Sequence, residues 1–214
     1  QDADYAAQYR AYVAKVRAAE AGASAAGGNG TRLSEAVARY LFKLMAYKDE
    51  YEVARLHTDP AFTAKIESMF EGDYTVVHHL APPLTAKRNA KGELVKRPFG
   101  PWVRKAFDVL AKRKGLRGTV LDIFGYSEER RTERRLIDEY KASIDEVLRS
   151  GPATPERRAL AVEIARIPED IRGYGHVKSR HLAAARAKWD ALMAQWRSGG
   201  TAAPSPQPAA APAS

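Results

Sequence analysis

The sequence predicts a mainly α-helical protein, a helical bundle with a small β hairpin or short strands around residues 73–98. Apolar side chains recur every three to four residues in several long segments, which is typical of amphipathic helices. β-branched and aromatic residues are concentrated in one short stretch, residues 73–80, upstream of a segment rich in turn residues. The hydrophobic content of 45% in 214 residues is enough for one core of ordinary size.

The chain opens with a predicted helix over residues 1–20, which carries tyrosines and valines on one side. Residues 21–30 are mostly glycine, alanine and serine, which offer little packing surface and lose much backbone entropy on ordering. We therefore predict a flexible linker at residues 21–30, between an opening helix that ends a preceding module and a helical domain over residues 31–198. The proline- and alanine-rich residues 199–214 are predicted to be disordered, because they bury too little to offset the entropy of ordering.

Residues 31–59 are predicted to form one long helix. Thr31 or Ser34 is placed to cap its N-terminus. Asp59-Pro60 ends it, because a proline disfavours helical backbone in the residue before it. The buried stripe consists of side chains at helical spacing: Leu33, Val37, Leu41, Leu44 and Tyr51.

The middle of the chain is predicted to alternate short elements. A short helix follows over residues 60–70, and residues 73–80 form a strand. Residues 86–97 carry turn residues at positions 89–92 between two possible short strands, which predicts the hairpin.

Four further helices are predicted after the hairpin. Pro101 begins a helix that ends near Lys114-Gly115, and an irregular connection leads to Ser127. Ser127 caps a long helix to about residue 149, and Thr154 caps the next one. The last helix covers residues 177–197 and buries two tryptophans.

Composition narrows the classes of function. The chain has no cysteine, so it forms no disulfide and holds no iron–sulfur cluster through its own thiolates. The formal net charge of +9 favours anionic partners: nucleic acid, acidic proteins or phosphorylated cofactors. No apolar stretch is long enough to cross a bilayer and no signal peptide is visible, so we expect a cytoplasmic protein. Because Gln1 opens the chain inside a predicted helix, we also expect a piece of a longer protein.

Two groups of charged residues are candidate sites. The first is a basic patch for docking an anion or a partner, drawn from the lysine- and arginine-rich residues 87–117: Lys96, Arg97, Arg104 and Lys105. The second is a polar cluster that we interpret as a buried structural network or an interface, with direct ligand contact as the alternative: Tyr47, Lys48, Asp49, Glu50 and Tyr51.

Neither the histidines nor any known motif points to catalysis. His78 and His79 are adjacent and point to opposite faces of a strand, so we interpret them as structural, and likewise His176 and His181, whose spacing does not suit one helix face. No nucleophile elbow, P-loop, Rossmann fingerprint or zinc-binding helix motif is present, so we assign no catalytic, cofactor-binding or metal-ligating residue.

Three segments have a distinctive sequence: ARYLFKLMAYKDEYEVARLHTDP at residues 38–60, FGPW at 99–102 continued by KGLRGTVLDIFGYSEERRTER at 114–134, and IRGYGHVKSRHLAAA at 171–185. In this order they resemble the C-terminal region of indolepyruvate ferredoxin oxidoreductases, a branch of the 2-oxoacid:ferredoxin oxidoreductases. The opening QDADYAAQYR resembles the junction that follows the γ-type domain of that family, which makes residues 1–20 the end of that module.

The resemblance implies an accessory, structural and subunit-packing domain of an enzyme that oxidatively decarboxylates arylpyruvates to aryl-acetyl-CoA. Thiamine diphosphate, magnesium and iron–sulfur clusters are implied for other modules of that enzyme and none for this chain. The implied partners are the catalytic modules, with ferredoxin or CoA at the basic patch. The alternative is a basic nucleic-acid-binding or free-standing protein-interaction module, which the net charge alone favours.

Overall fold

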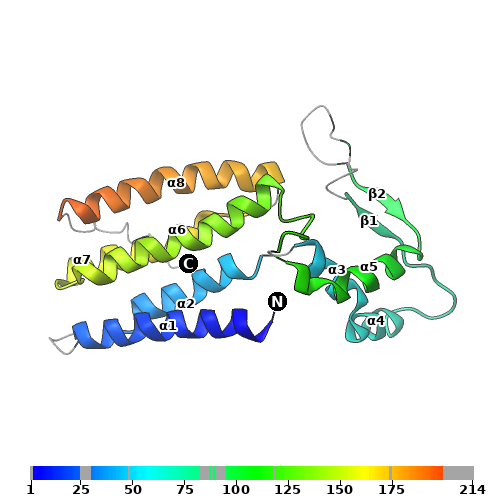
Figure 1. Ribbon diagram of the computed structural model, residues 1–214, viewed down its shortest axis with the longest axis horizontal. Helices are drawn as coiled ribbons and strands as arrows, with labels where there is room; N and C mark the ends of the chain where they lie inside the picture. The colour runs from blue at the N-terminus through cyan, green and yellow to red at the C-terminus, as the bar shows by residue number, and fades with distance from the viewer. Residues whose placement is uncertain are drawn as a thin grey trace, which may run out of the picture.

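The computed structural model describes residues 2–24, 30–47, 49–81, 87, 89, 95–117, 119–173 and 175–199. These residues form eight α-helices, two short 3₁₀-helices and one two-stranded antiparallel sheet. The predicted class, mainly α with a small hairpin, is therefore confirmed. Figure 1 shows two lobes side by side, a bundle of long helices and a smaller lobe of short helices with the hairpin.

The bundle consists of α1 (Ala3–Ser24), α2 (Arg32–Met45), α6 (Glu128–Ser150), α7 (Pro155–Arg166) and α8 (Gly175–Arg197), with the 3₁₀-helix η2 (Ile167–Asp170) after α7. Helix α2 packs against α1, α6 and α7, and α8 packs against α6, α7 and η2. Helix α2 is thus central to the bundle although it lies near the start of the chain.

The small lobe is inserted into the chain between α2 and α6. It contains α3 (Glu50–Thr58), α4 (Pro60–Glu67), β1 (His78–Leu80), β2 (Arg97–Phe99), α5 (Val103–Lys112) and the 3₁₀-helix η1 (Lys114–Leu116). Helices α3 and α5 pack together, and the two strands pair with His79 opposite Pro98. A separate small core of Ala54, Val103 and Phe107 holds this lobe together.

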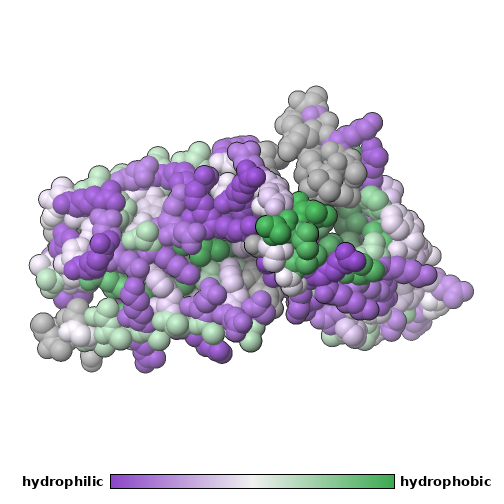
Figure 2. All heavy atoms as spheres, in the orientation of Figure 1, coloured by the Kyte–Doolittle hydropathy of each residue, from purple (hydrophilic) through white to green (hydrophobic). Residues whose placement is uncertain are grey.

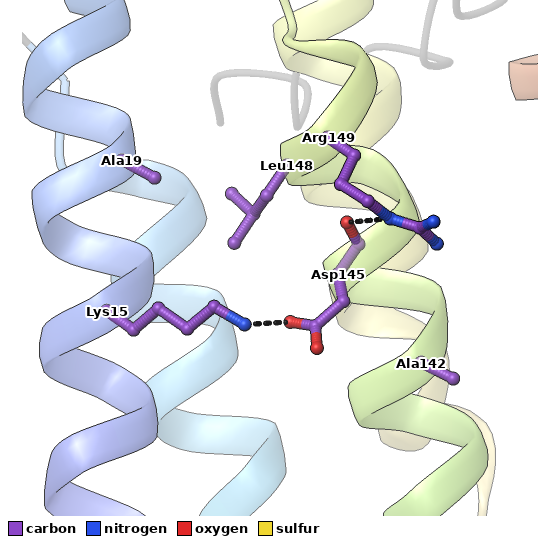
Figure 3. Close-up of a pocket in the computed structure, with 6 residues that line it drawn as sticks. All are labelled: Lys15, Ala19, Ala142, Asp145, Leu148 and Arg149. Carbon is purple, nitrogen blue, oxygen red and sulfur yellow. Dashed lines mark hydrogen bonds and ion pairs between the residues drawn. The ribbon is translucent and has the colours of Figure 1, made fainter.

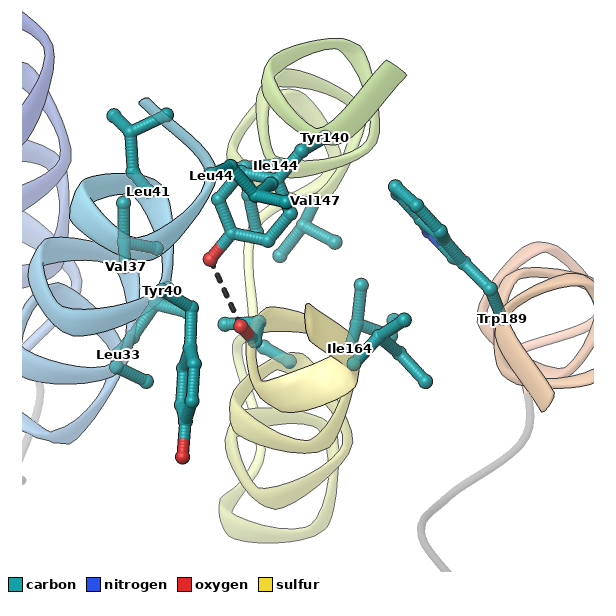
Figure 4. Close-up of a cluster of buried hydrophobic side chains, with 14 of the residues drawn as sticks. Leu33, Val37, Tyr40, Leu41, Leu44, Tyr140, Ile144, Val147, Ile164 and Trp189 are labelled. Carbon is teal, nitrogen blue, oxygen red and sulfur yellow. Dashed lines mark hydrogen bonds between the residues drawn. The ribbon is translucent and has the colours of Figure 1, made fainter. Parts of the chain in front are cut away.

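The bundle core brings together apolar faces of α2, α6, α7 and α8 (Figure 4), and α1 contributes Val16 to it. Leu41 of α2, Ile144 of α6 and Ile164 of α7 are completely buried in it. Tyr140 is also fully buried, and its hydroxyl donates to the carbonyl oxygen of Ala165 at 2.8 Å. Burial raises the pKa of Tyr140 well above its usual range, so its hydroxyl remains a hydrogen-bond donor.

Helix α1 is part of the bundle and extends further than predicted. It continues to Ser24, so the linker expected at residues 21–30 begins inside the helix, and residues 25–29 lie outside the described residues. Its Val16 is fully buried in the bundle core. The carboxylate of Glu20 accepts from the backbone amides of Leu33 (2.8 Å) and Ser34 (2.9 Å). Glu20, rather than the predicted Thr31 or Ser34 side chain, therefore caps α2.

The prediction of one helix over residues 31–59 is wrong. Helix α2 ends at Met45 and α3 begins at Glu50. The reason is Asp49, which adopts an extended backbone and accepts from the backbone amide of Glu52 at 2.8 Å, as an N-cap residue does. Leu44 and Tyr51, expected on one stripe, consequently belong to different lobes.

The other predicted elements differ less. The side chains of Ser127 and Thr154 cap α6 and α7 as predicted, through the amides of residues 130 and 157. The strand expected from residue 73 begins only at His78. Most of the turn at residues 89–92 lies outside the described residues, as do residues 200–214 of the tail. Among the helices that the structure describes, none combines the length and the apolar character needed to cross a bilayer.

Tyr140→Phe tests the core hydrogen bond. We expect it to lower the free energy of unfolding by about 1–2 kcal/mol, measured by urea denaturation, because the buried Ala165 carbonyl is left without that partner. Tyr126→Phe is the matched control. The Tyr126 hydroxyl donates to the carbonyl of Val120 at 2.9 Å, but the residue is 55% exposed, so water replaces the bond and the change stays below about 0.5 kcal/mol. Equal losses in the two variants would contradict the assignment.

Candidate functional site

The two lobes meet where the chain passes between them, once between α2 and α3 and once between η1 and α6. Among the described elements, no bundle helix packs extensively against an element of the small lobe. The contacts between the lobes are instead made by a set of mostly charged side chains, which we call the joint: Tyr47, Asp49, Glu50, Tyr51, Arg117, Asp122, Arg130, Glu133, Arg134 and Lys178.

Asp49 is the first anchor of the joint and is only 3% exposed. While it caps α3, its Oδ1 also accepts from Arg117 Nη2 at 2.8 Å, and Arg117 Nε binds the other carboxylate oxygen. This two-point contact is the strong geometry of an arginine–carboxylate pair. Burial opposes the charge on Arg117, but the hydrogen bonds and the charge of Asp49 outweigh it and raise the pKa of Arg117. The guanidinium therefore stays charged.

Asp122 is the second anchor and is 2% exposed. Its Oδ1 accepts from the Tyr51 hydroxyl (3.3 Å) and the Gly125 amide (3.0 Å), and its Oδ2 accepts from Arg134 Nη2 (2.8 Å). One carboxylate thus binds α3, the loop before α6 and α6 itself. Burial and then the charge of Asp122 raise the pKa of Tyr51, so the phenol remains a donor.

Gly125 fits against this second anchor because it has no side chain. A Cβ at this position would lie 2.6 Å from Arg134 Nη2 and closer still to Asp122 Oδ2. Any other residue would have to displace the Asp122–Arg134 pair. The glycine in the loop is therefore explained by a close approach rather than by backbone conformation.

A third group links α3, α6 and α8. Glu133 is 7% exposed, accepts from Lys178 Nζ of α8 at 2.6 Å and contacts Arg130 with its other oxygen. Arg130 Nε lies 3.4 Å from Glu50 Oε2, an ion-pair distance, yet both atoms are buried and neither has a hydrogen-bond partner. The two groups therefore attract as charges without an aligned hydrogen bond. Arg130 also lies over the ring of Tyr47, 5.8 Å from its centroid.

The charged side chains of the joint are paired with one another. Its buried carboxylates Asp49, Asp122 and Glu133 are each bound by a cation from another segment. Removing one member of such a pair leaves an uncompensated buried charge, which is strongly destabilising. Within the described part of the chain, no three histidine or carboxylate side chains are grouped so that they could hold a metal ion.

The structure brings most of the predicted polar cluster into the joint. Tyr47, Asp49, Glu50 and Tyr51 all belong to it, whereas Lys48 lies outside the described residues. Sequence reasoning missed their partners, which follow some seventy residues later. The signal that could have found them is the charged sequence EERRTERR at residues 128–135, which contains Arg130, Glu133 and Arg134.

The basic patch is divided between two elements of the small lobe. Lys96 directly precedes β2, Arg97 is its first residue, and Arg104 and Lys105 lie in the first turn of α5. All four are exposed, and none forms an ion pair with a described carboxylate. Arg104 Nη2 donates to the Thr63 hydroxyl at 3.0 Å. The patch remains a predicted docking surface.

A pair of histidines not recognised from the sequence lies in the small lobe. The ring of His78 is 5.0 Å from that of His57, and both contact Phe107, at 5.6 and 5.3 Å. Burial lowers the pKa of both histidines, with further lowering by His78 at His57 and by Arg104 at His78. His79, on the other face of the strand, is exposed.

Asp49→Asn tests the first anchor. The asparagine amide keeps the cap on α3 but leaves Arg117 buried without a counter-charge. We therefore expect the free energy of unfolding of the small lobe to fall by about 3 kcal/mol. Hydrogen exchange should accelerate in α3 and α5 while α7 is unaffected. The control is Glu146→Gln, which breaks an exposed pair with Arg197 and should cost less than about 1 kcal/mol. The same small effect in both variants would refute a structural joint.

The histidine pair makes the small lobe sensitive to acid. The folded pKa values of His57 and His78 lie below the unfolded value of about 6.5, so the unfolded chain binds more protons below that pH. Stability contributed by the neutral rings is present above about pH 6.5 and is lost as the pH falls. Hydrogen exchange in α3 and α5 at pH 5.5 and 7.5, corrected for intrinsic rates, measures this, with His79→Gln as the control. Greater protection at pH 5.5 would contradict it.

Comparison with known proteins places the chain in one family. No curated protein and no solved structure matches it. The profile of a family described as "Family of unknown function (DUF6537)" matches residues 1–191, a range that includes α1, the small lobe, the joint and most of α8. Because the match extends over most of the sequence, this chain belongs to the DUF6537 family.

Proposed function

We propose that this chain is a cytoplasmic accessory domain of an indolepyruvate or arylpyruvate:ferredoxin oxidoreductase, with a structural and subunit-packing role. The proposal rests mainly on one observation: the three segments whose sequence resembles indolepyruvate ferredoxin oxidoreductases meet in the joint. Residues 38–60 supply Asp49 and Tyr51, residues 114–134 supply Arg117 and Asp122, and residues 171–185 supply Lys178.

This convergence explains why the distinctive text does not contain a catalytic motif. Asp49, Arg117 and Lys178 each pair with an opposite charge from another of the three segments, so changing one leaves a charge without its counter-charge. A domain whose two lobes must keep a fixed relation needs such a network. In this proposal the thiamine diphosphate, magnesium and iron–sulfur clusters belong to the catalytic modules. This chain provides a surface against which those modules pack.

The loop before α6 offers the surface for packing. Four large apolar side chains are exposed within this one loop: Val120 (84%), Leu121 (65%), Ile123 (61%) and Tyr126 (55%). Figure 2 shows hydrophobic atoms gathered on this face where the lobes meet, at the position of the loop in Figure 1. Exposed apolar groups that cluster in this way mark protein interfaces.

The same loop favours a protein partner over the nucleic-acid alternative. Surfaces that bind DNA are more polar and much more positively charged than protein interfaces. The exposed groups of this loop are apolar, although the whole chain is basic. The basic patch of Lys96, Arg97, Arg104 and Lys105 then serves a secondary contact, with acidic ferredoxin or with the phosphates of CoA.

A loop variant tests the proposal in the complete oxidoreductase. Combined Val120→Ser and Leu121→Ser should weaken association with the catalytic modules at least about tenfold, because two apolar side chains no longer lose water at the interface. The chain's own unfolding free energy should change by less than about 0.5 kcal/mol, since both side chains are exposed. Affinity is measured by titration calorimetry, and stability by urea denaturation.

Val109→Ser is the matched control, because Val109 is 55% exposed on α5 and lies outside the loop. It should leave the affinity unchanged. If the loop variant binds as tightly as this control, the loop is not the interface. An oxidoreductase that lacks residues 34–197 but assembles and turns over normally would overturn the accessory role itself.

A further inference from the structure

The small lobe contains a cavity of about 230 Å³ that is separate from the joint. It lies between α3, α4, the residues leading into β1, and the start of α5. Its lining contains two imidazole rings, further aromatic side chains and one guanidinium, and none of the joint residues contributes to it. At about 30 Å³ per water molecule, its volume is that of roughly eight waters, which suits a small organic ligand.

The polar groups of the cavity are incompletely paired within the described chain. Nδ1 of His57 is buried and has no hydrogen-bond partner, which is costly unless another molecule supplies one. Arg104 donates to Thr63 but forms no ion pair with a described carboxylate, so most of its donors are available. A guanidinium with free donors recognises a carboxylate by two parallel hydrogen bonds.

The walls of the cavity are suited to a flat apolar body. The ring of His57 is edge-on to that of Phe62, with centroids 5.8 Å apart, and Tyr74 and Ile66 line the same space. Aromatic rings prefer such edge-to-face and offset-stacked neighbours. A ring of the ligand would therefore find both a stacking surface and an apolar floor.

We propose that this cavity binds a small aromatic carboxylate, whose carboxylate pairs with Arg104 and whose ring lies against His57 and Phe62. Glu67, exposed at the rim, opposes negative charge and so disfavours ligands that carry more than one. The inference does not depend on the proposed function, because it uses only the geometry of the small lobe.

Benzoate is the probe, and the imidazole C–H signals of the whole isotope-labelled chain in solution NMR are the readout. Benzoate should shift the signals of His57 and His78 and leave that of His181, on α8, unchanged. Benzamide, which has the ring without the charge, and acetate, which has the charge without the ring, should each bind at least about tenfold more weakly.

Single substitutions identify the groups responsible. Arg104→Gln should weaken benzoate binding at least about tenfold, whereas Lys105→Gln, its exposed neighbour outside the cavity, should have no effect. Glu67→Gln should tighten binding about threefold, because a repulsive charge is removed. This gain keeps the test informative if Arg104→Gln alters the fold, which the unliganded histidine signals would reveal.

Three results would overturn the proposal. The first is no shift of the His57 and His78 signals at any benzoate concentration. The second is equal affinity for benzoate and benzamide, because the site would then recognise only the ring. Equal affinity for benzoate and acetate counts in the same way, because the site would then recognise only the charge. The third is a Glu67→Gln variant that binds benzoate no more tightly than the unaltered chain.

Discussion

The pairing of buried charges between the lobes is the constraint on which the rest of the structure depends. The small lobe is an insertion in the bundle and shares little apolar surface with it among the described elements. Asp49 and Asp122 are almost fully buried, and each carboxylate is bound by an arginine, which compensates a charge that would otherwise be buried without a partner. The orientation of one lobe on the other therefore follows from Asp122, which binds both Tyr51 of α3 and Arg134 of α6, and from Glu50 of α3, which lies against Arg130 of α6.

The bundle provides the rigid support for this connection. Helix α1 is held through Val16 in the core and through Glu20, which satisfies the free amides at the start of α2. Tyr140 binds the end of α7 from inside the core. Lys178 of α8 reaches Glu133 of α6, so the last helix also contributes to the joint. A displacement of the joint side chains would therefore require the bundle helices that carry them to move as well.

Under the proposed function the two lobes have different roles. The loop before α6 contains Asp122 and Gly125, which are buried against the joint, and Val120 and Leu121, which are exposed. The same ion pairs that hold the lobes together therefore hold an apolar surface in a fixed position, as the proposed packing role requires. The cavity around His57 lies in the small lobe and is lined by none of the joint residues, so it is available to the proposed ligand.

Helical spacing and capping residues determined the class of the fold and most helix boundaries, because these are local properties of the chain. The caps at Ser127 and Thr154 were predictable for that reason. The break before α3 was not, because Asp49 interrupts an otherwise helical pattern and its partner Arg117 is 68 residues away. The polar cluster was recognised, but its partners and the meeting of His57 with His78 were not. Pairing of buried charges and rings depends on distances between segments, and only the tertiary structure decides those distances.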